Sequence, residues 1–162
     1  MKKAILLVVL APGLVGADAP SPGLEEEHPA MHATGSFDVE LEPRPADSPQ
    51  AETAGLSRLS LAKQYHGGLE AASHGEMMAA GDGTESGAYV AIEKVTGSLD
   101  GRRGSFLLVH SAVLRRGAPE DWTVKVVPDS GTAQLEGLEG SMIIRAEGKQ
   151  HFYELSYTLP PT

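Results

Sequence analysis

Residues 87–114 read GAYVAIEKVTGSLDGRRGSFLLVHSAVL, two apolar runs joined by a short turn sequence, LDGRRG. In the first run Tyr89 and Glu93 fall on one face, while Ile92 and Lys94 fall on the other. A period of two residues is typical of a β-strand. The Asp-Gly pair in the turn favours a tight hairpin, with the glycine at a positive φ. This stretch therefore predicts two long antiparallel strands.

The rest of the chain repeats the pattern of the hairpin. Six further strands are predicted, at residues 33–42, 57–67, 75–80, 121–128, 140–146 and 151–159. Glycine-rich breaks separate them, and no segment places apolar residues at helical spacing. A sheet of this size hides its edges by closing on itself. We therefore expect an all-β fold, a single eight-stranded antiparallel barrel whose interior is filled by side chains or holds one small ligand.

The first 17 residues have the features of a secretory signal peptide. Lys2 and Lys3 precede an apolar run, and Val15 and Ala17 occupy the small-residue positions before a cleavage site. The run is shorter than the roughly 20 residues that a membrane-spanning helix needs. We expect cleavage after Ala17, a secreted or periplasmic protein, and no membrane insertion after cleavage.

The mature chain is expected to hold one domain, the barrel of residues 33–162. Residues 18–32 are rich in proline, alanine and glutamate without apolar periodicity, which predicts a disordered leader. Residues 42–55 contain three prolines in EPRPADSPQAETAG and predict a long surface loop.

Composition excludes several classes of function. The chain has no cysteine, which rules out disulfides, thiol chemistry and iron–sulfur sites. Its formal charge is −9, and signal cleavage would remove two of the 13 basic residues and none of the 22 acidic ones, giving −11. Such a surface repels phosphate backbones, so we expect no nucleic-acid partner.

Six pieces of residues 75–159 occur in the order and spacing of a known family: GEM, YVAIEKVTGSLDGRRGSF, VHS, VVPDSGT, LEGLEG and YELSYTL. In these pieces the chain resembles the DUF3224 family of small bacterial proteins of unknown function, and ATGSF at residues 33–37 extends the likeness. The resemblance implies an eight-stranded barrel that is allene oxide cyclase-like, or lipocalin-like in its general form. It implies no catalytic residues.

Glu93 and His110 are the candidates for catalysis. His110 shares a strand face with Phe106, where its imidazole would act as a general base or hold a ligand; in the alternative, it lies at the barrel rim and hydrogen-bonds the backbone or a neighbouring strand. If the Tyr89 face lines the lumen, Glu93 is an inward carboxylate whose pKa burial would raise. If the Ile92 face lines it, Glu93 pairs with surface bases, and periodicity does not choose between the two faces.

Other side chains are candidates for ligand binding, because aromatic rings with a polar tip at a barrel mouth are what small-molecule sites use. The full set of ligand-binding candidates is Glu76, Tyr89, Glu93, Phe106, His110, Trp122, Tyr153 and Tyr157. For the aromatic residues the alternative is packing in the core or at the rim. The chain has no H-E-x-x-H and no H-x-H motif, so we expect neither a metal nor another cofactor.

Three functions fit these observations. The first is a binding barrel for a small apolar molecule, which needs a cavity of about 300 Å³ or more. The second is a cofactor-free isomerase or cyclase, by likeness of fold to allene oxide cyclase, although a fold does not determine an activity. The third is a filled barrel that serves as a structural or protein-interaction module. A homo-oligomer is compatible with all three.

Overall fold

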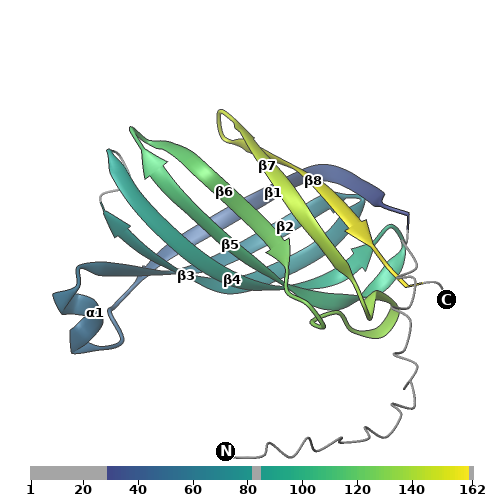
Figure 1. Cartoon of the computed structure of the whole chain (residues 1–162), viewed down its shortest axis with the longest axis horizontal. Helices are drawn as coiled ribbons and strands as arrows, with labels where there is room; N and C mark the ends of the chain where they lie inside the picture. The colour runs from purple at the N-terminus through teal and green to yellow at the C-terminus, as the bar shows by residue number, and fades with distance from the viewer. Residues whose placement is uncertain (1–28, 82–84, 161–162) are drawn as a thin grey trace, which may run out of the picture.

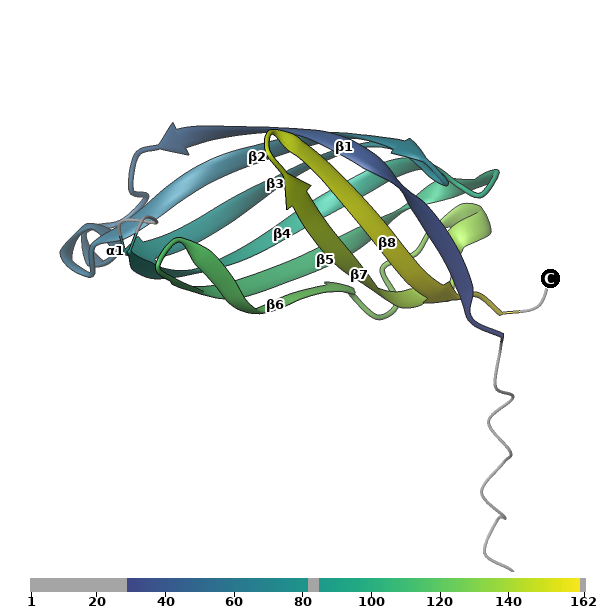
Figure 2. The same cartoon turned by 90° about the horizontal axis from the view of Figure 1, so that it is seen from above.

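The computed structural model describes residues 29–81 and 85–160, and shows eight strands in a closed antiparallel barrel in the order β1 to β8 (Figures 1 and 2). The elements are β1 (Met31–Arg44), α1 (Pro49–Thr53), β2 (Leu56–Gly67), β3 (Leu69–Gly81), β4 (Ser86–Leu99), β5 (Arg102–Arg115), β6 (Ala118–Val126), the 3₁₀ helix η1 (Ala133–Leu135), β7 (Glu139–Glu147) and β8 (Gln150–Thr158). The predicted eight-stranded barrel is confirmed. No helix in the described ranges is long and apolar enough to cross a membrane.

The barrel has two ends, which we name after the short helices that lie there (Figure 1). The connections β1–β2, β3–β4, β5–β6 and β7–β8 lie at the α1 end. The connections β2–β3, β4–β5 and β6–β7, the start of β1 and the end of β8 lie at the η1 end. In Figure 1 the α1 end is on the left and the η1 end on the right.

The predicted strand positions hold, but several boundaries move. The β4–β5 turn places Gly101 at φ 84°, as predicted. The main error is in β3, which begins at Leu69 instead of residue 75. Gly67 takes φ 109°, and a Cβ there would lie 2.5 Å from the Thr34 carbonyl oxygen, so the β2–β3 turn needs this glycine. The turn is shorter than the glycine-rich break predicted between these two strands, and β3 therefore begins earlier.

Two segments expected without regular structure are partly ordered. The signal peptide and residues 18–28 of the leader lie outside the described residues, but β1 begins at Met31, where it pairs with Tyr157 of β8. In the predicted loop of residues 42–55, β1 continues to Arg44 and α1 forms over five residues. The Ser48 hydroxyl caps α1 by accepting from the Ala51 N–H at 3.1 Å.

A loop helps to close the barrel at its weakest seam. The register between β6 and β7 contains one pair, Lys125 with Ser141. Beyond the end of β6, side-chain oxygens of the β6–β7 loop accept from alternate backbone N–H groups of β5. These bonds run from Leu107 N to Ser130 Oγ at 3.0 Å, from Ser105 N to Thr132 Oγ1 at 2.9 Å, and from Arg103 N to Gln134 Oε1 at 2.8 Å. The loop therefore takes the place of a strand along this part of β5.

The core is packed at the η1 end. Its most buried large side chains there are at most 2% exposed, and they are Leu69, Leu99, Phe106, Leu135, Leu138 and Tyr157. Leu135 and Leu138 come from η1 and the residues after it, so the β6–β7 loop fills this end as well as covering β5.

Candidate functional site

The face of β4 that carries Glu93 is the inner face of the barrel. Glu93 and Val95 are fully buried, whereas Val90 and Ile92 on the other face are each 55% exposed. Gly75 on β3 pairs with Glu93 across the strands, and a Cβ at this glycine would lie 2.8 Å from the Glu93 Cβ. The glycine therefore gives the glutamate side chain the space to enter the interior.

Glu93 is the centre of a group that we call the polar cluster, formed with Lys63 and Tyr65 of β2, Ser73 of β3 and His110 of β5. Glu93 Oε1 lies 2.8 Å from Lys63 Nζ, 2.9 Å from the Tyr65 hydroxyl and 2.8 Å from His110 Nε2. Glu93 Oε2 accepts from the Ser73 hydroxyl at 2.5 Å. All five residues are at most 8% exposed.

The pKa of Glu93 is lowered to about 2, so the expected rise is wrong in sign. Burial is the largest single influence and does raise the pKa, but the hydrogen bonds and charges of His110 and Lys63 together outweigh it. Burial lowers the pKa of Lys63, and the charge of Glu93 opposes that change. The pKa of Tyr65 is raised well above 10, first by burial and then by the charge of Glu93.

This electrostatic balance makes the cluster a poor source of general-base catalysis. A general base works best when its pKa lies near the operating pH. A carboxylate with a pKa of about 2 binds a proton too weakly for that role near neutral pH. An ionised carboxylate only accepts hydrogen bonds, so Nε2 of His110 is the donor in this pair and is occupied.

His110 does not lie at the barrel rim. It is 4% exposed and lies inside β5, which continues for five residues beyond it to Arg115. Its inward direction follows the alternation shared with Phe106. Its partner is the Glu93 carboxylate on the neighbouring strand β4, so the expected bond to a neighbouring strand is present, but not at the rim.

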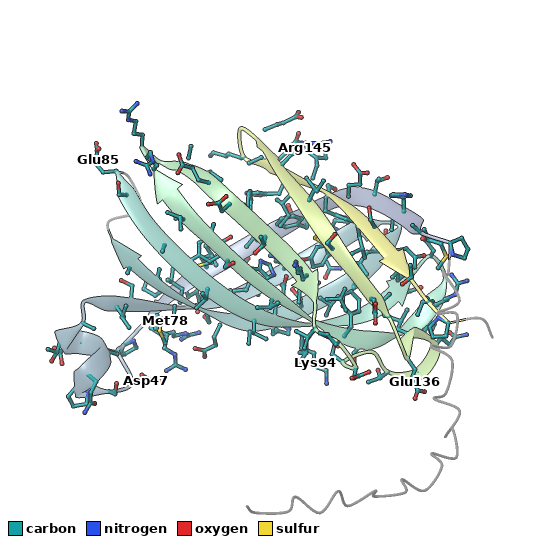
Figure 3. All side chains as sticks on the ribbon, viewed as in Figure 1. Asp47, Met78, Glu85, Lys94, Glu136 and Arg145 are labelled. Atoms are coloured by element: carbon teal, nitrogen blue, oxygen red, sulfur yellow. The ribbon has the colours of Figure 1, made fainter. Side chains whose placement is uncertain are left out.

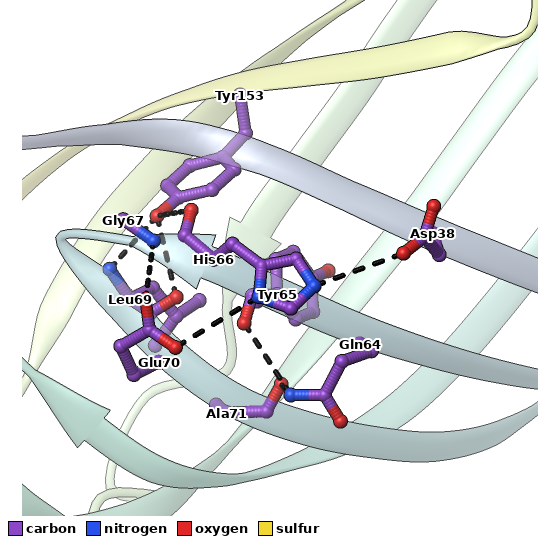
Figure 4. A network of polar contacts seen from close by, with 9 residues as sticks. All are labelled: Asp38, Gln64, Tyr65, His66, Gly67, Leu69, Glu70, Ala71 and Tyr153. Carbon is purple, nitrogen blue, oxygen red and sulfur yellow. Dashed lines mark hydrogen bonds and ion pairs between the residues drawn. The ribbon is translucent and has the colours of Figure 1, made fainter.

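Three predicted ligand-binding aromatic residues instead stabilise the η1 end. The Tyr153 hydroxyl accepts from the Leu69 N–H at 2.8 Å and donates to the His66 carbonyl at 3.2 Å, which ties β8 to the β2–β3 turn (Figure 4). The Tyr157 hydroxyl donates to Asp100 at 2.7 Å. Phe106 is 1% exposed within the packed core. None of the three is open to a ligand at the α1 end.

Glu76 lies on the outer face of β3, away from the lumen. Its carboxylate forms two hydrogen bonds with the Arg58 guanidinium on β2, from Nε and Nη2. Strand alternation explains this position, because Glu76 stands one residue from the inward-facing Gly75. A ligand in the lumen therefore does not reach Glu76.

The α1 end contains a pocket of about 560 Å³, which we call the mouth pocket. Apolar or aromatic side chains form most of its inner wall, namely Leu59, Met77, Ala79, Tyr89 and Leu114. Arg44 and Arg58 lie at its edge. No member of the polar cluster lines it, but Tyr89 lies near enough to Glu93 for that charge to contribute to its raised pKa, after the larger effect of burial.

Two of the predicted ligand-binding residues, Tyr89 and Trp122, remain near this pocket. Tyr89 lines it, and the pKa of Tyr89 responds to the Trp122 indole N–H, which places the two polar tips close together. Trp122 is partly buried on β6 and packs against the core. Of the eight candidates, the structure thus brings Glu93 and His110 together in the cluster, and it brings Trp122 close to Tyr89, which lines the pocket while Trp122 lies behind that wall.

Sequence reasoning missed three members of the polar cluster. Lys63 and Tyr65 stand on the inward face of β2 with Leu61, and a lysine on an apolar face is a signal for a buried carboxylate partner. Ser73 gave no signal, because its segment was assigned to a break between strands.

Comparison with known proteins gives a family. The sequence model of the family DUF3224, described as a protein of unknown function, matches residues 33–157. No curated protein matches the chain. A crystal structure of a protein of unknown function from the DUF3224 family of Shewanella oneidensis MR-1 is 42% identical, with a TM-score of 0.72; the match covers 83% of this chain and all of that one.

Proposed function

The chain belongs to the DUF3224 family, and on that premise we propose that it is a binding barrel that holds one small, largely apolar molecule in the mouth pocket. The observation that carries the proposal is the contrast between a packed η1 end and a pocket of about 560 Å³ at the α1 end. Ligand pockets commonly have volumes of about 300–1,000 Å³ and mostly apolar walls.

Binding without catalysis is favoured over an isomerase or cyclase by the polar cluster. An isomerase of this kind needs a proton acceptor that faces the substrate. Glu93 is fully buried, and its oxygens already accept four hydrogen bonds. We propose that the cluster instead anchors β2, β3, β4 and β5 to one another beneath the pocket.

Native mass spectrometry of the protein purified from the organism's own cells tests the binding proposal. We expect a complex heavier than the bare chain by the mass of one small molecule, lost on mild organic extraction. A variant with the pocket filled, Ala79→Trp, should carry none, while the outer-face control Ala62→Trp should carry as much as the wild type. A wild-type chain that purifies bare and is not stabilised by any apolar probe would contradict the proposal.

Location outside the cytoplasm is a second proposal, and it rests on residues 1–17 of the sequence. Two lysines, an apolar run and small residues before Ala17 support it. The intact mass of the protein from its own cells should correspond to a chain that begins at Asp18. A full-length chain recovered from the cytoplasm would contradict it.

A homo-oligomer is favoured by a groove on the outer face of β3, β4 and β5. Its floor is apolar, with Met78 43%, Val90 55%, Ile92 55% and Val109 39% exposed. Contiguous exposed apolar surface commonly marks a protein contact. Figure 3 shows Asp47, Met78 and Lys94 along this side of the barrel.

The charges beside the groove fit a second copy of the same chain. At one end Asp47 and Glu76 surround Arg58, whereas at the other end Lys94 has no carboxylate partner within the described ranges. A two-fold axis through the groove would set the Lys94 of each copy against the acidic end of the other. We propose a dimer through this face as the interaction function.

Sedimentation velocity tests the dimer. Wild-type protein should sediment as a dimer and Ile92→Lys as a monomer. Ile143→Lys is the matched control, because Ile143 is 57% exposed on β7, outside the groove, and should leave the dimer intact. A monomeric wild type, or equal behaviour of the two variants, would rule out this interface.

A further inference from the structure

Trp122 carries an unused hydrogen-bond donor near the mouth pocket. Its Nε1 is buried and has no hydrogen-bond partner among the described residues. A buried donor without an acceptor destabilises the fold, so such groups in native proteins usually meet a partner of some kind. The ring itself packs against the hydrophobic core, which fixes the direction of the N–H.

Tyr89 adds a second unused donor at the same place. It lines the mouth pocket, and within residues 29–81 and 85–160 its hydroxyl donates a hydrogen bond to no other group, although the Trp122 N–H approaches its oxygen. Burial raises the pKa of Tyr89, and the neighbouring Trp122 N–H lowers it in part, so the hydroxyl keeps its proton near neutral pH. The Trp122 N–H is close enough to the Tyr89 oxygen to lower the Tyr89 pKa, but Nε1 has no hydrogen-bond partner among the described residues, and the Tyr89 O–H has no acceptor there.

Among the described residues, the edge of the pocket has no free positive charge to hold an acid. The Arg44 guanidinium bonds Glu42 at 2.8 Å and the Ser60 hydroxyl at 3.0 Å. The Arg58 guanidinium bonds Glu76 and lies 3.8 Å from Asp47. Three carboxylates therefore surround two guanidinium groups, on a chain of formal charge −9. An anionic ligand would meet net repulsion here.

From these contacts we propose that the mouth pocket takes an uncharged, mainly apolar molecule with one carbonyl-type acceptor, to which Trp122 Nε1–H and the Tyr89 hydroxyl donate. The inference rests on the proposed binding function and specifies the class of its ligand. The apolar wall of Leu59, Met77 and Leu114 holds the hydrocarbon part. The two donors select a ketone, ester or similar group over a plain hydrocarbon, because they are otherwise left without an acceptor.

The single tryptophan makes the site directly observable. The full ¹⁵N-labelled chain has one indole N–H resonance, which moves to a higher proton frequency when the group donates to an acceptor. We would titrate it with three probes of nine carbons: heptyl methyl ketone, nonane and nonanoate. The ketone should shift this resonance and bind about tenfold more tightly than nonane, while nonanoate should bind most weakly.

Tyr89→Phe is the informative variant, because it removes the hydroxyl and leaves the ring. It should lower the affinity for the ketone about threefold to tenfold and leave the affinity for nonane unchanged. Tyr157→Phe, which removes a hydroxyl at the η1 end, is the matched control and should change neither affinity.

The outcomes separate the two proposals. If all three probes bind equally well, or the indole resonance does not respond to the ketone, the assigned ligand class is wrong while the binding function stands. If nonanoate binds best, the ligand is an acid and the charge argument fails. If no probe binds, the binding function and this inference fall together.

Discussion

At the η1 end of the barrel Leu99 and Leu135 are at most 1% exposed, whereas at the α1 end Leu41 is 45% exposed. Leu41 stands on the side of β1 that carries the buried Phe37, so strand alternation does not distinguish these ends. The short helices do. η1 buries Leu135 in the barrel, while α1 buries no residue at all. An element that enters the lumen turns inward-facing residues into core, and an element that stays outside leaves them as the wall of a pocket.

The polar cluster lies between these two ends, and its loss should have the largest effect. Glu93→Ala leaves the buried Lys63 without its carboxylate, and removing one partner of a buried ion pair costs about 3–5 kcal/mol. Urea denaturation of wild type and variant measures the loss. Glu76→Ala removes a carboxylate from a solvent-exposed ion pair on the outer face and should cost far less than Glu93→Ala. Equal losses would mean that the cluster does not support the barrel.

The packed end should be more sensitive to lost side-chain volume than the open end. Leu99→Ala at the η1 end creates a cavity in the core and should cost about 2–5 kcal/mol. Leu114→Ala removes the same atoms from the pocket wall, where solvent fills the space, and should cost about 1 kcal/mol. Denaturation midpoints of the two variants test the comparison directly. A larger loss for Leu114→Ala would reverse our assignment of core and pocket.

Acid should weaken the barrel through the same cluster. The folded pKa of Glu93, about 2, is below its ordinary value of 4.5, so its contribution is complete above pH 4.5 and is lost as the pH falls towards and through 2. The whole loss amounts to up to about 3 kcal/mol. Unfolding free energies measured at several pH values should fall across this window in the wild type and stay flatter in Glu93→Gln. Parallel profiles would contradict the assigned pKa.

Local sequence pattern was enough to predict the barrel. In residues 87–114 the alternation, the turn and the positive φ of Gly101 all depend on near neighbours, and the structure has each of them. The β6–β7 loop was harder, because it covers β5 with side-chain oxygens instead of a strand ladder. Because side-chain oxygens take the place of a strand here, the loop sequence does not show the alternation of apolar and polar residues that predicts a strand.

The site depends on register between distant strands, which one sequence does not provide. Glu93 meets Lys63 from 30 residues away, Tyr65 from 28 and His110 from 17. The inward face of β4 was undecided because Val90 and Ile92 are as apolar as the residues opposite them. The sign of the Glu93 pKa shift then followed from partners whose presence the sequence did not show, and burial alone predicted the opposite.

The smallest predicted effect compares two tyrosine hydroxyls, one at each end. Tyr153→Phe removes the acceptor of the Leu69 N–H and the donor to His66, and should cost about 1–2 kcal/mol. Tyr89→Phe removes a hydroxyl that donates to no described residue and contacts only the Trp122 N–H among them, and it should change the unfolding free energy by no more than about 0.5 kcal/mol. Both follow from urea denaturation of the ligand-free protein. A cost of 1 kcal/mol or more for Tyr89→Phe would mean that its hydroxyl already has a partner in the free protein, and the donor assigned to a ligand would then belong to the fold.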